Sequence, residues 1–173
     1  MADLIAVTAL VAILLMMLAE LRVSLAHERE LFRAGAIEAP DPVYSTMRWA
    51  YPGTFVAMAI EGLVTASPPG LLTIVGVVVF AVGKAFKVWA IASLGTRWTY
   101  RVLVIPSAPL VTRGPYRFMR HPNYVGVVGE LVAVALMTGS RIGSPIAVVG
   151  FGVLMLKRIA VEQRALSSAA PGA

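Results

Sequence analysis

The chain has 173 residues, of which 58% are hydrophobic and 14% are charged, and its formal net charge is +6. A soluble domain has about 45–50% apolar and about 25% charged residues, so this composition excludes an ordinary soluble domain and indicates a lipid-facing surface. There is no cysteine, and the two histidines are His27 and His121. These counts exclude a disulfide framework and a thiolate site, and we expect no metal.

Five apolar segments predict an all-α integral membrane protein with about five transmembrane helices. In chain order they are Leu4–Leu25, Trp49–Ala66, Leu71–Leu94, Tyr124–Thr138 and Ile142–Leu156. The first lacks the basic start and the small-residue cleavage site of a signal peptide, so we expect a retained helix. The last two are short and only a few residues apart, which predicts a short helical hairpin.

The polar connections are predicted to be loops. Ala26–Arg48 is charged, Gly95–Arg120 is long, and Ser67–Gly70 has the composition of a tight turn. The tail Ser167–Ala173 consists of small residues and is expected to be disordered. Residues 1–166 are therefore expected to form a single domain.

The positive charges predict the orientation of the chain in the membrane. Of the 15 Lys and Arg residues, all except Lys84, Lys87 and Arg141 fall on the side shared by the two large loops and the C-terminus. The positive-inside rule then puts these loops and the C-terminus in the cytosol and the N-terminus outside. Topology and anionic lipids thus explain the basic charge, and we expect no nucleic-acid partner.

Several charged residues fall within the apolar segments, where an unpaired charge is costly. Glu20 and Lys87 lie near the expected cytosolic ends and are predicted to reach the interface. Glu61 and Lys84 are expected to pair between the second and third helices or to line a cavity, and Glu130 faces the same choice. Because Lys84 and Lys87 share a helix face, their spacing predicts either two anionic partners or a water-filled groove.

The segment Gly114–Gly126 has the composition of a loop that enters a helix. Pro122 suits the first helical turn with His121 at the cap, and Gly126 permits the close approach of another backbone. The free N–H groups of a helix start attract anions. Charged and aromatic side chains flank this start, namely Tyr116, Arg117, Phe118, Arg120 and Tyr124. The segment could be a pocket for a carboxylate-bearing cofactor with an aromatic base, or an interfacial belt that anchors the helix.

Arg158 and Glu162 are spaced i, i+4 and share a helix face. They could form a surface ion pair of small energetic value. Alternatively, Arg158 would contact an anionic substrate and Glu162 the ammonium group of a cofactor.

The sequence Arg120–Gly126 (RHPNYVG), followed by Arg158 and Glu162, resembles the isoprenylcysteine carboxyl methyltransferase family. The resemblance extends to Leu94-Gly95, Leu110–Thr112 and Gly114–Tyr116. It implies a membrane methyltransferase that uses S-adenosylmethionine in a cytosolic cofactor pocket. The N-terminal half, with Arg29–Glu38, Tyr44, Met47 and Glu61, is similar to a short bacterial branch that methylates alkylpyrones or alkylresorcinols. This likeness implies a bacterial inner membrane.

The resemblance also implies roles for individual residues. The cofactor would be bound by Leu110, Val111, Tyr116, His121, Pro122, Asn123, Tyr124 and Glu162. Ala108, Pro109 and Arg101 align with further cofactor contacts. Arg158 and His121 would be catalytic, and Arg158 and Glu130 would contact the substrate. Where the family often has a second Glu this chain has Gln163, and many members continue with a further segment where the given sequence ends in Ser167–Ala173.

The function implied is O-methylation of a carboxylate or acidic hydroxyl on a lipophilic substrate, such as a prenylcysteine or a long-chain alkylpyrone or alkylresorcinol. That substrate would enter from the bilayer, with membrane lipids around the protein. Two alternatives stay open: a phospholipid N-methyltransferase and a non-catalytic membrane scaffold. For an acceptor that is already anionic, catalysis would come from positioning and the exclusion of water. A less acidic hydroxyl would need a base, for which His121 and Glu130 are the candidates.

Overall fold

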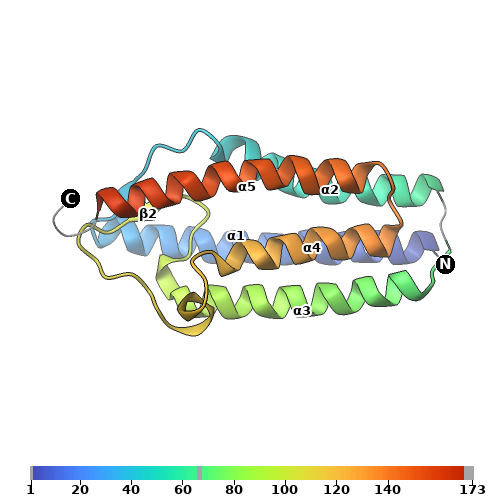
Figure 1. Ribbon diagram of the computed structural model, residues 1–173, viewed down its shortest axis with the longest axis horizontal. Helices are drawn as coiled ribbons and strands as arrows, with labels where there is room; N and C mark the ends of the chain where they lie inside the picture. Colours follow the sequence, from blue (N-terminus) through green and yellow to red (C-terminus); the bar gives the residue numbers. More distant parts are fainter. Residues whose placement is uncertain (1, 66–67, 170–173) are drawn as a thin grey trace.

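The computed structural model describes residues 2–65 and 68–169, and five α-helices dominate it. They are α1 (Ala2–Arg33), α2 (Tyr44–Thr65), α3 (Leu71–Leu94), α4 (Pro122–Thr138) and α5 (Gly143–Ser168). Figure 1 shows them side by side along the long axis, each antiparallel to the one before it. The α1–α2 and α3–α4 connections lie at the end of the bundle where α5 finishes, and the N-terminus lies at the other end.

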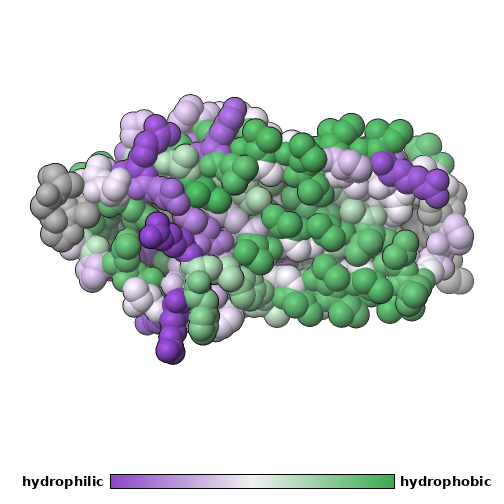
Figure 2. All heavy atoms as spheres, viewed as in Figure 1, coloured by the Kyte–Doolittle hydropathy of each residue, from purple (hydrophilic) through white to green (hydrophobic). Residues whose placement is uncertain are grey.

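The two long connections are folded against each other rather than open. Strand β1 (Ile37–Glu38) pairs antiparallel with strand β2 (Leu103–Val104), with Ile37 opposite Val104. Two short 3₁₀ helices, η1 (Gly95–Arg97) and η2 (Gly114–Arg117), lie in the α3–α4 connection. Figure 2 shows hydrophilic side chains gathered mainly at this end of the visible face and hydrophobic ones over most of the rest. We call the end of the bundle where α1, α3 and α5 finish, at Arg33, Leu94 and Ser168, the loop end.

Three of the described helices are long and apolar enough to cross a membrane, namely α1 from Val7, α3 and α5. Helix α4 is apolar but shorter. The all-helical prediction is therefore confirmed, with three candidate spans. Spanning of the bilayer by α2 and α4 stays a prediction.

The predicted helix ends were wrong in three places. Helix α1 continues to Arg33, α2 begins at Tyr44, and α5 continues to Ser168. The extensions of α1 and α5 contain several Ala, Glu, Arg and Leu residues, which favour helix, but their charged residues make these extensions too polar to be recognised as apolar segments. The short α4–α5 turn was predicted correctly, but α5 with 26 residues is not a short helix. Residues 170–173 of the predicted disordered tail lie outside the described residues.

Helices α3 and α4 pack closely through glycines. A Cβ atom at Gly126 would lie 2.7 Å from the Cβ atom of Lys87 and 3.2 Å from the carbonyl oxygen of Gly83. Neither atom can move away easily, because the Gly83 oxygen belongs to the backbone and the Lys87 Cβ atom is bonded directly to the backbone. Gly126 therefore permits the close approach that its sequence context predicts.

We expect Gly126→Ala to lower the free energy of unfolding by about 1–3 kcal/mol, because the added methyl group overpacks the α3–α4 contact. The matched control is Gly53→Ala in α2, where a new Cβ would meet no described atom within 4 Å outside its own surroundings. That control should be neutral or stabilising by up to about 1 kcal/mol, because alanine favours helix. Thermal unfolding in detergent micelles measures both variants. Equal effects would contradict the proposed packing.

A buried ion cluster joins α1, α3 and α4. Lys84 Nζ lies 2.9 Å from Glu20 Oε1 and 2.6 Å from Glu130 Oε1, and Lys87 Nζ lies 2.7 Å from Glu20 Oε2 and 3.4 Å from Glu130 Oε2. Tyr51 of α2 donates its hydroxyl hydrogen to Glu130. Of the two alternatives expected for the two lysines, two anionic partners or a water-filled groove, the structure shows the first. The prediction that Glu20 and Lys87 reach the interface was wrong, since Lys87 is 2% exposed.

The predicted Glu61–Lys84 ion pair was also wrong. Glu61 lies at the other end of the bundle and accepts hydrogen bonds from the start of α5. The donors are Ser140 Oγ at 2.5 Å and the backbone nitrogens of Arg141, Ile142 and Gly143 at 2.7, 2.9 and 2.6 Å. A carboxylate from α2 thus satisfies the free N–H groups where α5 begins and complements its dipole.

Candidate functional site

A large cavity lies among the helices toward the loop end, with a volume of about 1650 Å³. One wall is apolar and comes from α1, through Leu14, Met17, Leu18, Leu21, Leu25 and Leu31. Another part of the lining is polar and comes from the start of α4 and the last part of α5. Ligand pockets are usually about 300–1,000 Å³. The cavity therefore has room for a polar cofactor together with part of a lipid.

The start of α4 forms part of the polar region. Helix α4 begins at Pro122 with His121 as its N-cap, as the sequence predicts. Asn123 accepts a hydrogen bond from the indole of Trp98 at 3.3 Å, which ties the first turn to the α3–α4 connection. His121, Asn123 and Tyr124 all line the cavity. Free N–H groups at this helix start can bind an anion such as a carboxylate.

Glu162 of α5 is the acidic residue in the described lining of the cavity. Its Oε1 atom accepts a hydrogen bond from the Tyr124 hydroxyl at 2.5 Å, and its Oε2 atom lies 3.3 Å from His121 Nδ1. Arg158 Nε lies 3.3 Å from Oε1. The α4 start and the end of α5 are thus joined through one carboxylate. That carboxylate can bind a cationic group in the cavity.

Arg158 is buried at 5% exposure and lies beside Glu162 in the same cavity. Its Nη1 atom forms an ion pair with Asp41 Oδ2, and its Nη2 atom donates to the carbonyl oxygen of Tyr100. The guanidinium carbon lies 5.7 Å from the ring centre of Tyr44. Arginine has five N–H donors in a planar fork. With three engaged by described residues, one on each Nη can still bind an oxygen of a ligand.

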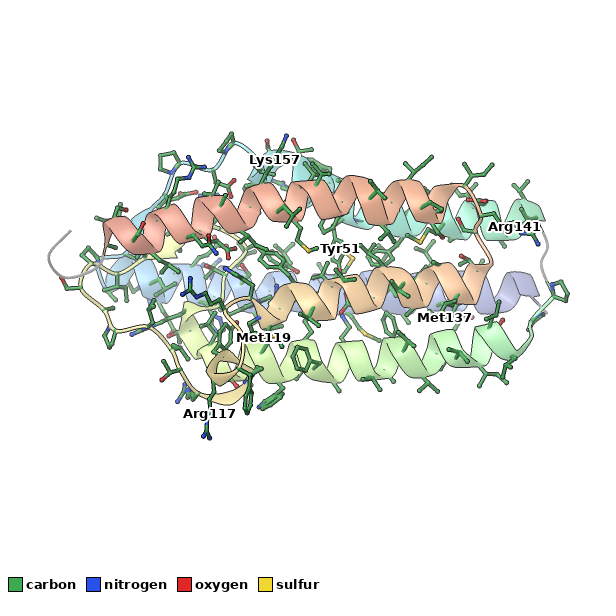
Figure 3. All side chains as sticks on the ribbon, in the orientation of Figure 1. Tyr51, Arg117, Met119, Met137, Arg141 and Lys157 are labelled. Carbon is green, nitrogen blue, oxygen red and sulfur yellow. The ribbon has the colours of Figure 1, made fainter. Side chains whose placement is uncertain are left out.

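The cavity extends inward from Arg158 by about two helical turns. Tyr51, seven residues after Tyr44 on α2, stacks on Phe151 with a ring separation of 4.9 Å. Phe151 in turn precedes Arg158 by seven residues on α5. Seven residues span about 10 Å of helix. Figure 3 shows Tyr51 in the middle of the bundle, at this inner level. Lys87 of the ion cluster also lines the cavity here.

Tyr116 of η2 also lines the cavity. Burial, together with the nearby Glu162 carboxylate, raises the pKa of the Tyr116 hydroxyl to about 12. The hydroxyl group therefore stays neutral at physiological pH and can donate a hydrogen bond. Its ring offers a face on which a planar base can stack.

The structure brings most of the predicted site residues to this one cavity. Those that line it are Leu110, Val111, Tyr116, His121, Asn123, Tyr124, Arg158 and Glu162. Arg101, Ala108 and Pro109 line it as well. Pro122 is fully buried and shapes the start of α4. Glu130 is 1% exposed and belongs to the ion cluster rather than to the lining of the cavity.

The sequence interpretation missed Asp41, Tyr100 and the place of Tyr44 beside Arg158. Asp41 is followed by Pro42 and precedes α2, a pattern that is typical of a helix start. Its Oδ1 atom does accept hydrogen bonds from the backbone nitrogens of Val43 and Tyr44 at 2.9 and 3.1 Å. That pattern identifies a helix cap, but no local signal connects Asp41 to an arginine 117 residues away.

A model of the isoprenylcysteine carboxyl methyltransferase (ICMT) family matches residues 72–168, which include α4, α5 and most of α3. An uncharacterized protein of Bacillus subtilis, YpbQ, is 30% identical over 159 residues, which cover 91% of this chain and 94% of that protein. An uncharacterized protein of Haemophilus influenzae is 24% identical over 158 residues, 87% of this chain and 88% of that protein. No solved structure was found to match the chain.

Proposed function

Because the chain belongs to the isoprenylcysteine carboxyl methyltransferase family, whose membership implies a methyltransferase, we propose that it methylates an oxygen of a lipophilic acceptor with S-adenosylmethionine. Family membership and three helices able to cross a membrane indicate an integral membrane protein. The observation that carries the proposal is the Glu162 carboxylate, held by His121, Tyr124 and Arg158 beside a large cavity with one apolar wall.

The residues of the polar region fit S-adenosylmethionine. Glu162 would bind the ammonium group, and the N–H groups at the start of α4 would bind the carboxylate. Tyr116 and His121 offer ring faces for adenine, with Leu110 and Val111 nearby on the cavity wall. When bound, the cofactor supplies a methyl group on a positively charged sulfur. The apolar wall of α1 would hold the alkyl part of the acceptor, which would enter from the bilayer.

Charge favours an acceptor with an anionic or acidic oxygen. Arg158, Lys87 and Arg101 pair with carboxylates outside the lining, and the described lining also includes Arg48, Arg97, Arg120 and Arg164 against the single acid Glu162. Arg158 would orient the acceptor oxygen through its remaining N–H groups. A protonated amine, the resting form of a phospholipid amine, would be repelled by these cations. The lining therefore favours O-methylation over N-methylation of a phospholipid.

His121 can act as a base when the acceptor is a hydroxyl. Its Nδ1 atom faces the Glu162 carboxylate, which stabilises the proton on that nitrogen. Its Nε2 atom then carries the lone pair and lies 3.4 Å from the amide nitrogen of Gln163, a donor that suits this tautomer. An acceptor hydroxyl that displaces the Gln163 amide would give Nε2 the proton that it loses on methylation. A carboxylate acceptor has no such proton and would depend on positioning alone.

Saturable binding of S-adenosylmethionine to the purified protein in detergent tests the proposal. We expect Glu162→Gln to weaken binding by about 10-fold or more, because a hydrogen bond to a charged group is worth about 1.5–3 kcal/mol. The control is Glu30→Gln on the exposed part of α1, which should bind the cofactor like the original chain. Absence of saturable binding would instead support a membrane scaffold.

The acceptor class is tested with labelled S-adenosylmethionine and a panel of lipids in the same detergent. Prenylcysteines, long-chain alkylpyrones and alkylresorcinols represent the oxygen acceptors, and phosphatidylethanolamine represents the amines. Base-labile products indicate esters, base-stable products indicate ethers, and a methylated head group would contradict O-methylation.

A further inference from the structure

Asp41 joins the start of α2 to Arg158 in the last part of α5. One oxygen of its carboxylate caps α2 through the backbone nitrogens of Val43 and Tyr44, and the other forms an ion pair with Arg158 of α5. Both side chains of the pair are buried, with 7% of Asp41 and 6% of Arg158 exposed. Yet Asp41 is not among the described residues that line the cavity. It therefore acts on the cavity through Arg158.

We infer that Asp41 is a positioning residue for methyl transfer, an inference that rests on the proposed function of Arg158. Asp41 takes one N–H of Nη1, the Tyr100 carbonyl takes one of Nη2, and Glu162 lies beside Nε. A planar guanidinium with three fixed contacts cannot rotate about its stem. The two N–H groups that remain then point in set directions, which determines where an acceptor oxygen binds.

The rest of the α1–α2 connection keeps Asp41 in place. Ala39 donates its backbone N–H to the carbonyl oxygen of Val102 at 2.9 Å, directly after the β1–β2 pairing. Glu38 binds Arg101 at 3.0 Å. Asp41 is thus held from the β1 side and by its own bonds to the start of α2. A residue anchored in this way can orient a partner at little further entropic cost.

The test separates orientation of Arg158 from capping of α2. Serine is also a good helix cap but is too short to reach Arg158, so Asp41→Ser removes the ion pair and keeps the cap. We expect kcat for methyl transfer to fall by about 10- to 100-fold, the size expected when a reacting group is misplaced by about 1 Å. The Kd for S-adenosylmethionine should not change. Glu30→Gln, which changes an exposed carboxylate near the end of α1, is the control and should keep its activity.

A double-mutant cycle identifies Arg158 as the residue through which Asp41 acts. In an Arg158→Lys background, Asp41→Ser should lower kcat little further, because lysine has no guanidinium group for Asp41 to orient. An equal loss in both backgrounds, or full activity of Asp41→Ser, would overturn the inference while leaving the proposed function intact.

A second readout does not depend on activity. The Arg158 Nη–H signals in the NMR spectrum of the ¹⁵N-labelled protein, assigned from their loss in Arg158→Lys, should exchange slowly with water, because Asp41 and the Tyr100 carbonyl each hold one of these hydrogens. Asp41→Ser should make the exchange of the Nη1 hydrogens fast, whereas Glu30→Gln should not. Unchanged exchange in Asp41→Ser would overturn the inference. If the original chain neither binds S-adenosylmethionine nor transfers methyl groups, the proposed function fails, and this readout still reports on the orientation of Arg158.

Discussion

Replacing Arg158 with lysine is expected to lower kcat for methyl transfer by at least about 100-fold, the usual cost of losing one preorganised donor in an active site. Lysine keeps the charge but has no planar fork, so it cannot contact Asp41, the Tyr100 carbonyl and Glu162 together and still bind an acceptor oxygen. Binding of S-adenosylmethionine should persist, because Glu162 keeps its contacts with Tyr124 and His121. Single-turnover methyl transfer and equilibrium binding measure the two effects separately.

The control for this variant is Lys157→Arg, the reverse exchange between lysine and arginine at the preceding residue. Lys157 is exposed and points away from α5 into the surroundings (Figure 3). The Lys157→Arg variant should have the same kcat and the same Kd for the cofactor as the original chain. A full rate of transfer in Arg158→Lys would contradict a role for this arginine in binding the acceptor oxygen.

A large loss of stability is expected for Lys87→Met. The lysine is 2% exposed and contacts both Glu20 and Glu130, so its removal leaves two buried carboxylates with Lys84 as their remaining lysine partner. Removing one partner of a buried ion pair costs about 3–5 kcal/mol, because the charge left behind is uncompensated. Unfolding in detergent by heat or denaturant measures the loss.

A second substitution that restores neutrality should rescue the protein. In Lys87→Met/Glu130→Gln, Lys84 and Glu20 form a neutral pair at 2.9 Å, and the side-chain amide introduced at position 130 can still accept the Tyr51 hydrogen bond. We expect the double variant to be more stable than Lys87→Met alone. If the second substitution instead adds to the loss, the stabilising effect of the cluster does not depend on its charge balance.

The number and the centres of the helices could be predicted from the sequence, because each has an apolar stretch. The ends of α1 and α5 could not. Residues 26–33 and 157–168 are polar and favour helix, and only their packing at the loop end decides that they continue the apolar helices. A prediction based on apolar composition therefore underestimates the length of helices whose ends are polar.

The site was predictable where its residues are close in sequence. His121, Pro122 and Tyr124 follow one another, and Arg158 and Glu162 are one helical turn apart, so their local geometry follows from helix rules. The contacts of Arg158 with Asp41 and Tyr100 join residues 117 and 58 positions apart. Contacts of that kind depend on which helices become neighbours.

The partners of the buried lysines illustrate the same limit. The spacing of Lys84 and Lys87 predicts one shared face with two anionic partners or a water-filled groove, and the structure shows the anionic partners. Which acids become these partners, Glu20 and Glu130 rather than Glu61, depends on the position of each acid along the long axis of the bundle. Glu61 lies near the end of α2 that is opposite the loop end, where it meets the start of α5.

The two attachments of α5 to α2 have a mechanical consequence. Glu61 binds the first residues of α5, and Asp41 binds Arg158, about 22 Å further along that helix. Sliding α5 by one residue, or turning it by one residue's rotation, would break both attachments at once. The depth of Arg158 relative to α2 is thus set at two distant points. A change in bilayer thickness that tilts the bundle would move the two helices as one body and leave the position of Arg158 relative to α2 unchanged.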